Sequence, residues 1–216
     1  ILSGVGIIAQ VGLGAAVVLV ELQPFLIMTH LALALGFLAT MIIICVAAQQ
    51  ARYPRPTFQQ TTTARQVNLL FATIASLLIL LLVGAFAGGS GARSWCTGWP
   101  LCNGQLIPVD QLIESWQVWV IFLHRVLTLP VTALVFFTGW SFRHCQDRRV
   151  KLHTTVAMCW TLLEIGLGAL NPLTTFNIGI TVAHLGLAAF IWSHLVATMA
   201  FLKIDSSPHY SGFAPS

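Results

Sequence analysis

The chain has 216 residues, of which 57% are hydrophobic and 7% are charged, and its formal net charge is +4. A soluble globular domain carries roughly 25% charged residues, so this composition excludes a water-soluble protein. The basic residues stand at the ends of apolar segments, which favours positions that flank a lipid bilayer over a nucleic-acid partner.

Apolar segments long enough to cross a bilayer recur along the whole chain, because a helix of about 20 residues spans roughly 30 Å of hydrocarbon. We therefore expect one all-α fold, a polytopic transmembrane bundle with six helices in this chain. The expected spans are about 2–20, 25–48, 67–87, 117–141, 154–173 and 177–201.

The basic residues also predict how these spans are oriented. They concentrate after the second span, after the fourth span and in the tail, at Arg52, Arg55, Arg65, Arg143, Arg148, Arg149, Lys151 and Lys203. The opposite side holds only Arg93. Because cytoplasmic loops are rich in Lys and Arg, we expect a multi-pass protein of the cell (inner) membrane with a cytoplasmic carboxyl terminus.

The longest connection on the outer side, residues 88–116, contains Cys96 and Cys102. An oxidising outer compartment permits a disulfide between them. Such a pair can be a structural clip or a redox-active dithiol, and the sequence leaves both open. A zinc site is disfavoured because two further ligands are not nearby in the sequence.

Two segments of the chain repeat each other at an offset of 154 residues. Residues 10–34 and 164–188 share nine identities in 25 positions without gaps. Gln10 aligns with Glu164, and each is followed 20 residues later by a histidine, His30 or His184. An even number of spans separates the two copies, which predicts a parallel repeat of the same orientation.

The repeat predicts how the chain divides into units. Residues 67–201 form a complete carboxyl-terminal four-helix bundle, and residues 1–48 form the second half of an amino-terminal one. Residues 49–66 connect them as a cytoplasmic loop, and residues 202–216 form a cytoplasmic tail. We expect the missing half to lie upstream of Ile1, which makes an eight-helix protein of two parallel bundles.

Three histidines lie inside the expected spans, and an intramembrane histidine is a functional candidate by default. His30, His124 and His184 each sit roughly 8 to 11 Å below the outer boundary, at 1.5 Å of rise per residue. His124 and His184 fall on separate helices of the complete bundle, which suits axial ligation of a heme iron. Hydrogen bonds to neighbouring backbone or hydroxyl groups are the structural alternative.

Arg125 follows His124 directly and therefore points about 100° away around the helix. A buried cation needs a partner, and either Glu164 or a heme propionate suits this role. Four glycines allow close approach of helices or of a flat macrocycle: Gly12, Gly14, Gly166 and Gly168. Ordinary helix packing is the more frequent use of such residues.

These motifs together resemble a known family. The ordered set Cys96-x-x-Trp-Pro-Leu-Cys102-Asn-Gly, His124-Arg125, Gly166-Leu-Gly-Ala and His184-Leu is similar to the carboxyl-terminal half of heme A synthases. Residues 10–34 resemble the end of that family's amino-terminal half. The resemblance implies an eight-helix oxidoreductase that converts the C8 methyl of heme O to a formyl group, supplying heme A to terminal oxidases.

The resemblance also implies roles for individual residues. His124 and His184 would ligate a heme b with Arg125 as a further cofactor-binding residue, His30 would bind the substrate heme O, and Cys96 and Cys102 would form a disulfide. The family's catalytic glutamate lies one turn before its first histidine. Val120 stands at that distance before His124, so we expect no catalytic residue in the complete unit, and this chain has no counterpart of the partner of His30.

The candidate partners are the lipid bilayer, a heme O synthase and terminal oxidase assembly factors, and a homo-oligomer or a larger membrane complex stays open. Three other functions remain in competition. The chain could be a membrane b-type cytochrome that only transfers electrons, or a quinone-linked disulfide oxidoreductase that uses Cys96 and Cys102. It could also be a non-catalytic subunit of a respiratory or photosynthetic complex.

Overall fold

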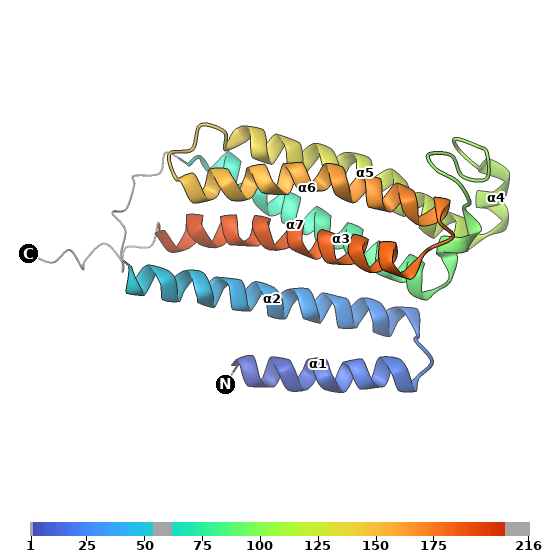
Figure 1. Ribbon diagram of the computed structural model, residues 1–216, viewed down its shortest axis with the longest axis horizontal. Helices are drawn as coiled ribbons and strands as arrows, with labels where there is room; N and C mark the ends of the chain where they lie inside the picture. Colours follow the sequence, from blue (N-terminus) through green and yellow to red (C-terminus); the bar gives the residue numbers. More distant parts are fainter. Residues whose placement is uncertain (1, 54–61, 206–216) are drawn as a thin grey trace, which may run out of the picture.

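The computed structural model describes residues 2–53 and 62–205, and these residues form helices and contain no strand. The long helices are α1 (Leu2–Leu19), α2 (Pro24–Arg52), α3 (Ala64–Gly89), α5 (Trp116–Ser141), α6 (Arg148–Leu173) and α7 (Ile178–Asp205). The connection between α3 and α5, which the sequence predicts to lie on the outer side and which is called the outer connection below, carries a 3₁₀ helix η1 (Ala92–Trp95) and a short helix α4 (Val109–Glu114). The all-α prediction is confirmed (Figure 1).

Five helices, α2, α3, α5, α6 and α7, are long and apolar enough to cross a membrane. The remaining expected span, 2–20, corresponds to α1, whose described apolar stretch, Gly4–Leu19, is shorter. Several helices extend beyond the predicted bounds: α2 ends at Arg52, α6 begins at Arg148, and α7 continues to Asp205. Hydropathy detects only the part of a helix that lies in lipid, whereas the helix continues into polar residues until a cap ends it.

Asp147 provides such a cap at the start of α6, where its carboxylate accepts a hydrogen bond from the Arg149 backbone amide at 2.8 Å. It also forms an ion pair with the Arg149 guanidinium at 2.8 Å. Burial of the carboxyl tends to raise the pKa of Asp147, but the hydrogen bonds and charge of Arg149 outweigh it and hold the pKa below its ordinary value. The first turn of α6 is therefore fixed by an ionised carboxylate.

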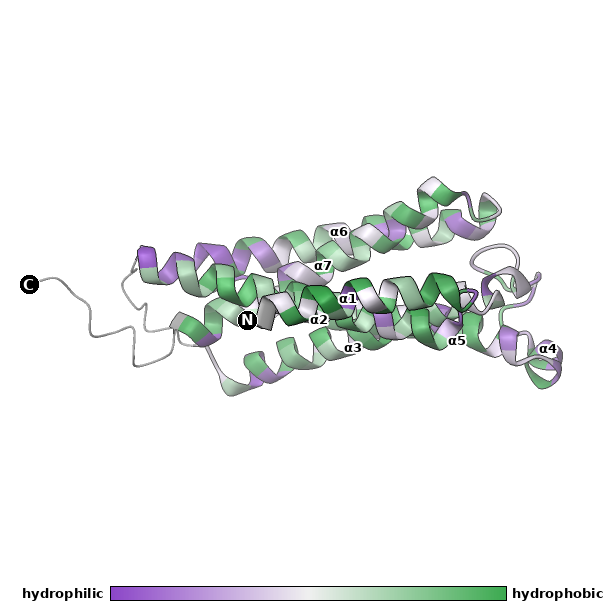
Figure 2. Cartoon of the chain, turned by 90° about the horizontal axis from the view of Figure 1, so that it is seen from below, coloured by the Kyte–Doolittle hydropathy of each residue, from purple (hydrophilic) through white to green (hydrophobic). Residues whose placement is uncertain are grey.

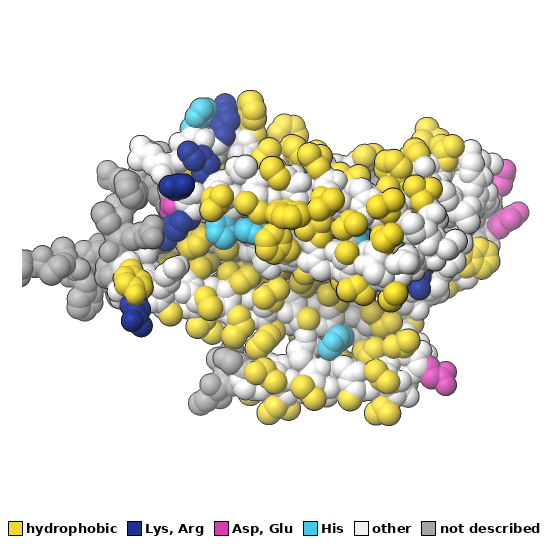
Figure 3. Space-filling model, viewed as in Figure 1, with side chains coloured by type: hydrophobic (Ala, Val, Ile, Leu, Met, Phe, Trp, Pro, Cys, Tyr) yellow, Lys and Arg dark blue, Asp and Glu magenta, His cyan; other side chains and the backbone are white. Residues whose placement is uncertain are grey.

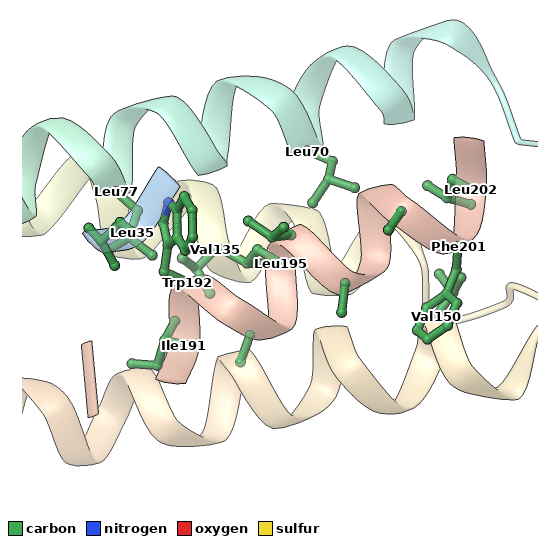
Figure 4. Packing of buried hydrophobic residues seen from close by; sticks show 14 of the residues in the cluster. Leu35, Leu70, Leu77, Val135, Val150, Ile191, Trp192, Leu195, Phe201 and Leu202 are labelled. Carbon is green, nitrogen blue, oxygen red and sulfur yellow. The ribbon is translucent and has the colours of Figure 1, made fainter. Parts of the chain in front are cut away.

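Four helices close into a bundle, because α3 packs on α5, α5 on α6, α6 on α7 and α7 on α3. Helix α2 packs against α3 and α7, and α1 packs against α2 (Figure 1). In α7, 56% of the most apolar stretch is buried, against 22% or less in the other four spans. Figure 4 shows α7 surrounded by side chains from its neighbours, among them Leu35, Leu70, Leu77, Val135 and Val150.

Apolar residues cover the length of the helices, as expected for surfaces in contact with lipid (Figure 2). In the face shown in Figure 3, most basic side chains lie at the end of the molecule where α6 begins, and most acidic ones at the opposite end. The outer connection with η1 and α4 lies at this opposite end (Figure 1). The two ends of the bundle are therefore chemically distinct.

The sequence repeat extends to the backbone. Helices α1 and α6 end at Leu19 and Leu173, and α2 and α7 begin at Pro24 and Ile178, again 154 residues apart. The turns between them contain consecutive left-handed residues at the same offset: Glu21 and Leu22 (φ 54° and 59°), and Thr175 and Phe176 (φ 50° and 59°). Because these turns share no residue identity, the hairpin geometry is repeated independently of the local side chains.

Candidate functional site

The three intramembrane histidines lie at the same end of the molecule, near the outer connection (Figure 1). His30 and His184 each stand six residues after the first residue of their helices, α2 and α7, and His124 stands eight residues after the start of α5. At 1.5 Å per residue these offsets correspond to roughly 9 to 12 Å along the helix axes. The predicted common depth is therefore present in the structure.

Each histidine ring packs against a glycine of the helix before it in its hairpin. The pairs are Gly84 with His124, Gly168 with His184, and Gly14 with His30. A Cβ atom at these glycines would fall 2.8, 3.1 and 3.3 Å from Cε1 of the respective ring. No atom outside their own helix lies within 4 Å of a Cβ placed at Gly12 or Gly166, so only one glycine of each Gly-x-Gly pair makes room for a ring.

Glu164 is the direct neighbour of the His184 ring. Its Oε1 lies 2.8 Å from Nδ1 of His184, at ion-pair distance but without the alignment of a hydrogen bond. Both side chains are largely covered, with 27% of His184 and 16% of Glu164 exposed. The second carboxylate oxygen, Oε2, is buried without a hydrogen-bond partner.

The equivalent residue of the first repeat, Gln10, behaves differently. Its Nε2 donates a long hydrogen bond of 3.4 Å to the backbone carbonyl of His30 rather than contacting the ring. Its Oε1 and Nδ1 of His30 are both buried without a hydrogen-bond partner. The two hairpins therefore have the same backbone geometry, but the Glu164 carboxylate contacts the ring of its histidine, whereas the Gln10 amide contacts the backbone of its histidine.

Arg125 turns toward the outer connection. Its guanidinium donates hydrogen bonds to the carbonyls of Leu101 at 3.0 Å and Cys96 at 2.8 Å. The ion pair with Glu164 considered from the sequence does not form, because Glu164 is engaged with His184 and Arg125 points away around its helix. Arg125 thus links the helix of His124 to the outer connection.

The disulfide between Cys96 and Cys102 is present. Both cysteines are buried in a small apolar cluster with residues from the ends of α3 and α5. Asn103 adds hydrogen bonds from its Nδ2 to the Trp95 carbonyl and from the Thr97 amide to its Oδ1. The connection is therefore a packed cover over the histidine end of the bundle, which the sequence reading did not foresee because it treated residues 88–116 as a loop.

His124 and His184 come from different helices of the closed bundle, α5 and α7. Nδ1 of His124 is buried without a hydrogen-bond partner. Within residues 2–53 and 62–205, no group of three or more His, Cys, Asp or Glu side chains is arranged to hold a bare metal ion. The arrangement instead offers two imidazoles, which is what a heme iron takes from a protein at its axial positions.

The structure also joins two histidines to which the sequence assigned no role. Nδ1 of His153 in α6 lies 2.8 Å from Nδ1 of His194 in α7, and His194 packs edge-on against Phe190. One ring must donate and the other accept. This pair lies nearer the other end of the bundle, and the two Nδ1 atoms are hydrogen-bonded to each other.

The chain is similar to known proteins of heme metabolism. Residues 1–196 match the family model COX15-CtaA, described as cytochrome oxidase assembly protein. A heme A synthase of Symbiobacterium thermophilum is 30% identical over 196 residues, covering 88% of this chain and 62% of the relative. A heme A synthase of Shewanella oneidensis is 23% identical over 218 residues, covering 93% of this chain and 65% of the relative.

A second kind of relative matches a shorter part of the chain. A protoheme IX farnesyltransferase of Halobacterium salinarum is 29% identical over 143 residues, covering 66% of this chain and 30% of the relative. The chain thus spans less than two thirds of the length of the heme A synthases and under one third of the farnesyltransferase.

Proposed function

The chain belongs to the COX15-CtaA family of cytochrome oxidase assembly proteins, and from this premise we propose that it acts as a heme A synthase. Heme A synthases are among its relatives, and its apolar helices make it a multi-pass membrane protein. The proposed reaction is oxidation of the C8 methyl of heme O to a formyl group, which yields heme A for terminal oxidases.

In this proposal His124 and His184 would hold a heme b in the bundle of α3, α5, α6 and α7. The observation that carries it is the presence of two imidazoles on separate helices of one bundle, each packed closely against a glycine of a neighbouring helix. When bound, such a heme supplies one-electron redox chemistry.

His30 is proposed to contact the substrate heme O, because it repeats His184 in position and rests on Gly14 as His184 rests on Gly168. Arg125 is proposed to serve the heme b indirectly, by holding the outer connection over His124 through two backbone carbonyls. Arg125 can also donate to a heme propionate, since an arginine carries five N–H donors and the two carbonyls do not use all of them. None of the residues around His124 and His184 is assigned a catalytic role.

The proposed domain organisation follows from the packing and the repeat. Residues 67–201 are one four-helix unit, and α1 with α2 is half of an equivalent unit. The basic end of the bundle, with the carboxyl terminus, faces the cytoplasm, and the connection with the disulfide faces outward. An outward-facing connection suits a disulfide, which persists in oxidising compartments.

Heme O synthase is the proposed functional neighbour. A protoheme IX farnesyltransferase is 29% identical to this chain over 143 residues. Farnesylated heme is the substrate proposed here. The class of reaction that supplies this substrate is therefore prenyl transfer to a heme.

The enzymatic claim is tested by co-expressing the protein with a heme O synthase in a host that makes no heme A. Extracted hemes are separated by reversed-phase chromatography, and heme A should appear only when both proteins are present. Heme O without heme A, from cells in which the protein is present in the membrane, would contradict the proposal. A membrane b-type cytochrome is the second candidate, because a bis-histidine heme alone suits electron transfer equally well.

The heme ligation is tested separately by the optical spectrum of the purified protein. A low-spin heme b signal is expected, and it should be lost or converted to a high-spin form in His124→Ala and in His184→Ala. A low-spin signal that survives either substitution would contradict the assignment of these ligands.

A further inference from the structure

We propose that Glu164 is a positioning residue for His184, which sets the orientation and donor strength of this ligand. The inference rests on the proposed ligation of a heme b by His184. It follows from the contact between Glu164 and the His184 ring and from a comparison of the two repeats.

The first step is the contact itself. Oε1 of Glu164 lies 2.8 Å from Nδ1 of His184, so this carboxylate is the acceptor within reach of an Nδ1–H. Nε2 is then the nitrogen left for the iron. Metal-bound histidines commonly donate their other N–H to a carboxylate, which fixes the ring and raises its basicity.

The second step is the burial of the carboxylate. Glu164 is 16% exposed, stands within a membrane-spanning helix, and has an Oε2 atom without a hydrogen-bond partner. No Lys or Arg forms an ion pair with it in the part of the chain that the structure describes. An intramembrane carboxyl is costly to retain, and its one close polar contact is the imidazole of the proposed ligand.

The third step is the internal comparison. The two hairpins have the same helix ends and the same left-handed turn residues, yet Gln10 stands where Glu164 stands in the second copy. Gln10 donates to the His30 backbone carbonyl and leaves Nδ1 of His30 without a partner. The fold therefore does not need a carboxylate at this position, and its presence beside His184 points to the ligand.

The consequence is that His184 and His30, the two proposed heme-binding histidines of the repeated hairpins, differ in donor strength. A stronger donor stabilises the ferric over the ferrous form of a heme, because it gives electron density to the more highly charged iron. The heme held by His184 is expected to have a lower reduction potential with Glu164 than with an amide in its place. The heme bound at His30 lacks this influence.

The test is the variant Glu164→Gln, which gives the second repeat the residue of the first. The protein is purified with heme b, and its reduction potential is measured by redox titration of the optical spectrum. The bis-histidine low-spin spectrum should persist, the potential should rise, and the affinity for added heme b should fall by about tenfold or more. The control is Glu114→Gln in the exposed helix α4, which removes the same charge outside the site and should change neither quantity.

The outcomes separate this inference from the proposed function. A wild-type protein without a bis-histidine heme would overturn both. A wild-type protein with such a heme, and a Glu164→Gln variant with unchanged potential and heme affinity, would overturn the role of Glu164 alone. If the amide variant holds too little heme to titrate, Glu164→Asp is compared with it: better heme retention in the aspartate variant supports the role, and equal loss contradicts it.

Discussion

Gly84 of α3 lies directly against the ring of His124 of α5, so that a Cβ at residue 84 would fall 2.8 Å from Cε1 of that imidazole. Contacts this short are not tolerated between packed atoms, and the ring has to move if a methyl group is added. Gly168 with His184 and Gly14 with His30 form similar but looser contacts, since a Cβ there would fall 3.1 and 3.3 Å from Cε1 of the ring. These glycines therefore act through the histidines they seat.

Gly84→Ala is expected to displace His124 and to reduce the low-spin heme b signal at least about tenfold, with overpacking that costs about 1 to 3 kcal/mol. The matched control is Gly88→Ala, one turn later on α3, where a Cβ meets nothing within 4 Å. That variant should keep the spectrum and gain about 0.5 to 1 kcal/mol from alanine's better helix propensity. Equal spectra for the two variants would contradict the seating role of Gly84.

Arg125→Lys is expected to loosen the outer connection, because a single ammonium cannot bond the Leu101 and Cys96 carbonyls as the guanidinium fork does. The loss of hydrogen bonds from a charged donor costs about 1.5 to 3 kcal/mol. The measurement is the rate at which a water-soluble phosphine reduces the Cys96–Cys102 disulfide in the folded protein, which should increase. Arg143→Lys, a change at the other end of α5, should leave this rate unchanged, and equal rates in both variants would argue against the clamp.

Asp147→Ala is expected to destabilise the start of α6 by about 1 kcal/mol at neutral pH, through loss of the cap and of the ion pair with Arg149. Asp147→Asn retains a capping oxygen and should lose less. The pKa of Asp147 is lowered in the folded protein, so its stabilisation is present above the unfolded pKa and is lost as the pH falls through the folded one.

The Tm difference between wild type and Asp147→Asn should therefore be largest at neutral pH, should begin to fall below about pH 4, and should vanish once the pH is below the lowered pKa of Asp147. Thermal unfolding in detergent, followed by tryptophan fluorescence at several pH values, measures it. A difference that is independent of pH would show that the charge of Asp147 does not contribute.

His153→Phe is expected to destabilise the protein by about 1 to 3 kcal/mol, because Nδ1 of His194 then lies between helices without its partner. The double variant with His194→Phe removes both polar groups and should lie closer to the wild type than the sum of the single effects. The heme b spectrum should stay unchanged in all three variants, since the pair is satisfied within itself. A spectral change would assign the pair to the heme site and contradict its structural role.

Much of this protein can be predicted from the sequence, because lipid imposes a simple rule on it. A bilayer requires long apolar helices with their backbone bonds satisfied internally, so composition and hydropathy are sufficient for the all-α fold and for five of the six expected spans. The repeat of Gln10 to Ala34 in residues 164–188 indicates equivalent hairpins. The placement of His30, His124 and His184 within the spans gives their common depth at a fixed rise per residue.

The partners of these residues depend on tertiary structure. Hydropathy has no information on how a helix is rotated about its axis, and rotation decides that Glu164 meets His184 and that Arg125 meets the carbonyls of Cys96 and Leu101. It also decides that Gly84 and Gly168 seat histidine rings while Gly166 does not. Depth in a membrane is a property of chain position, whereas side-chain contact is a property of how helices pack, and only the folded bundle specifies it.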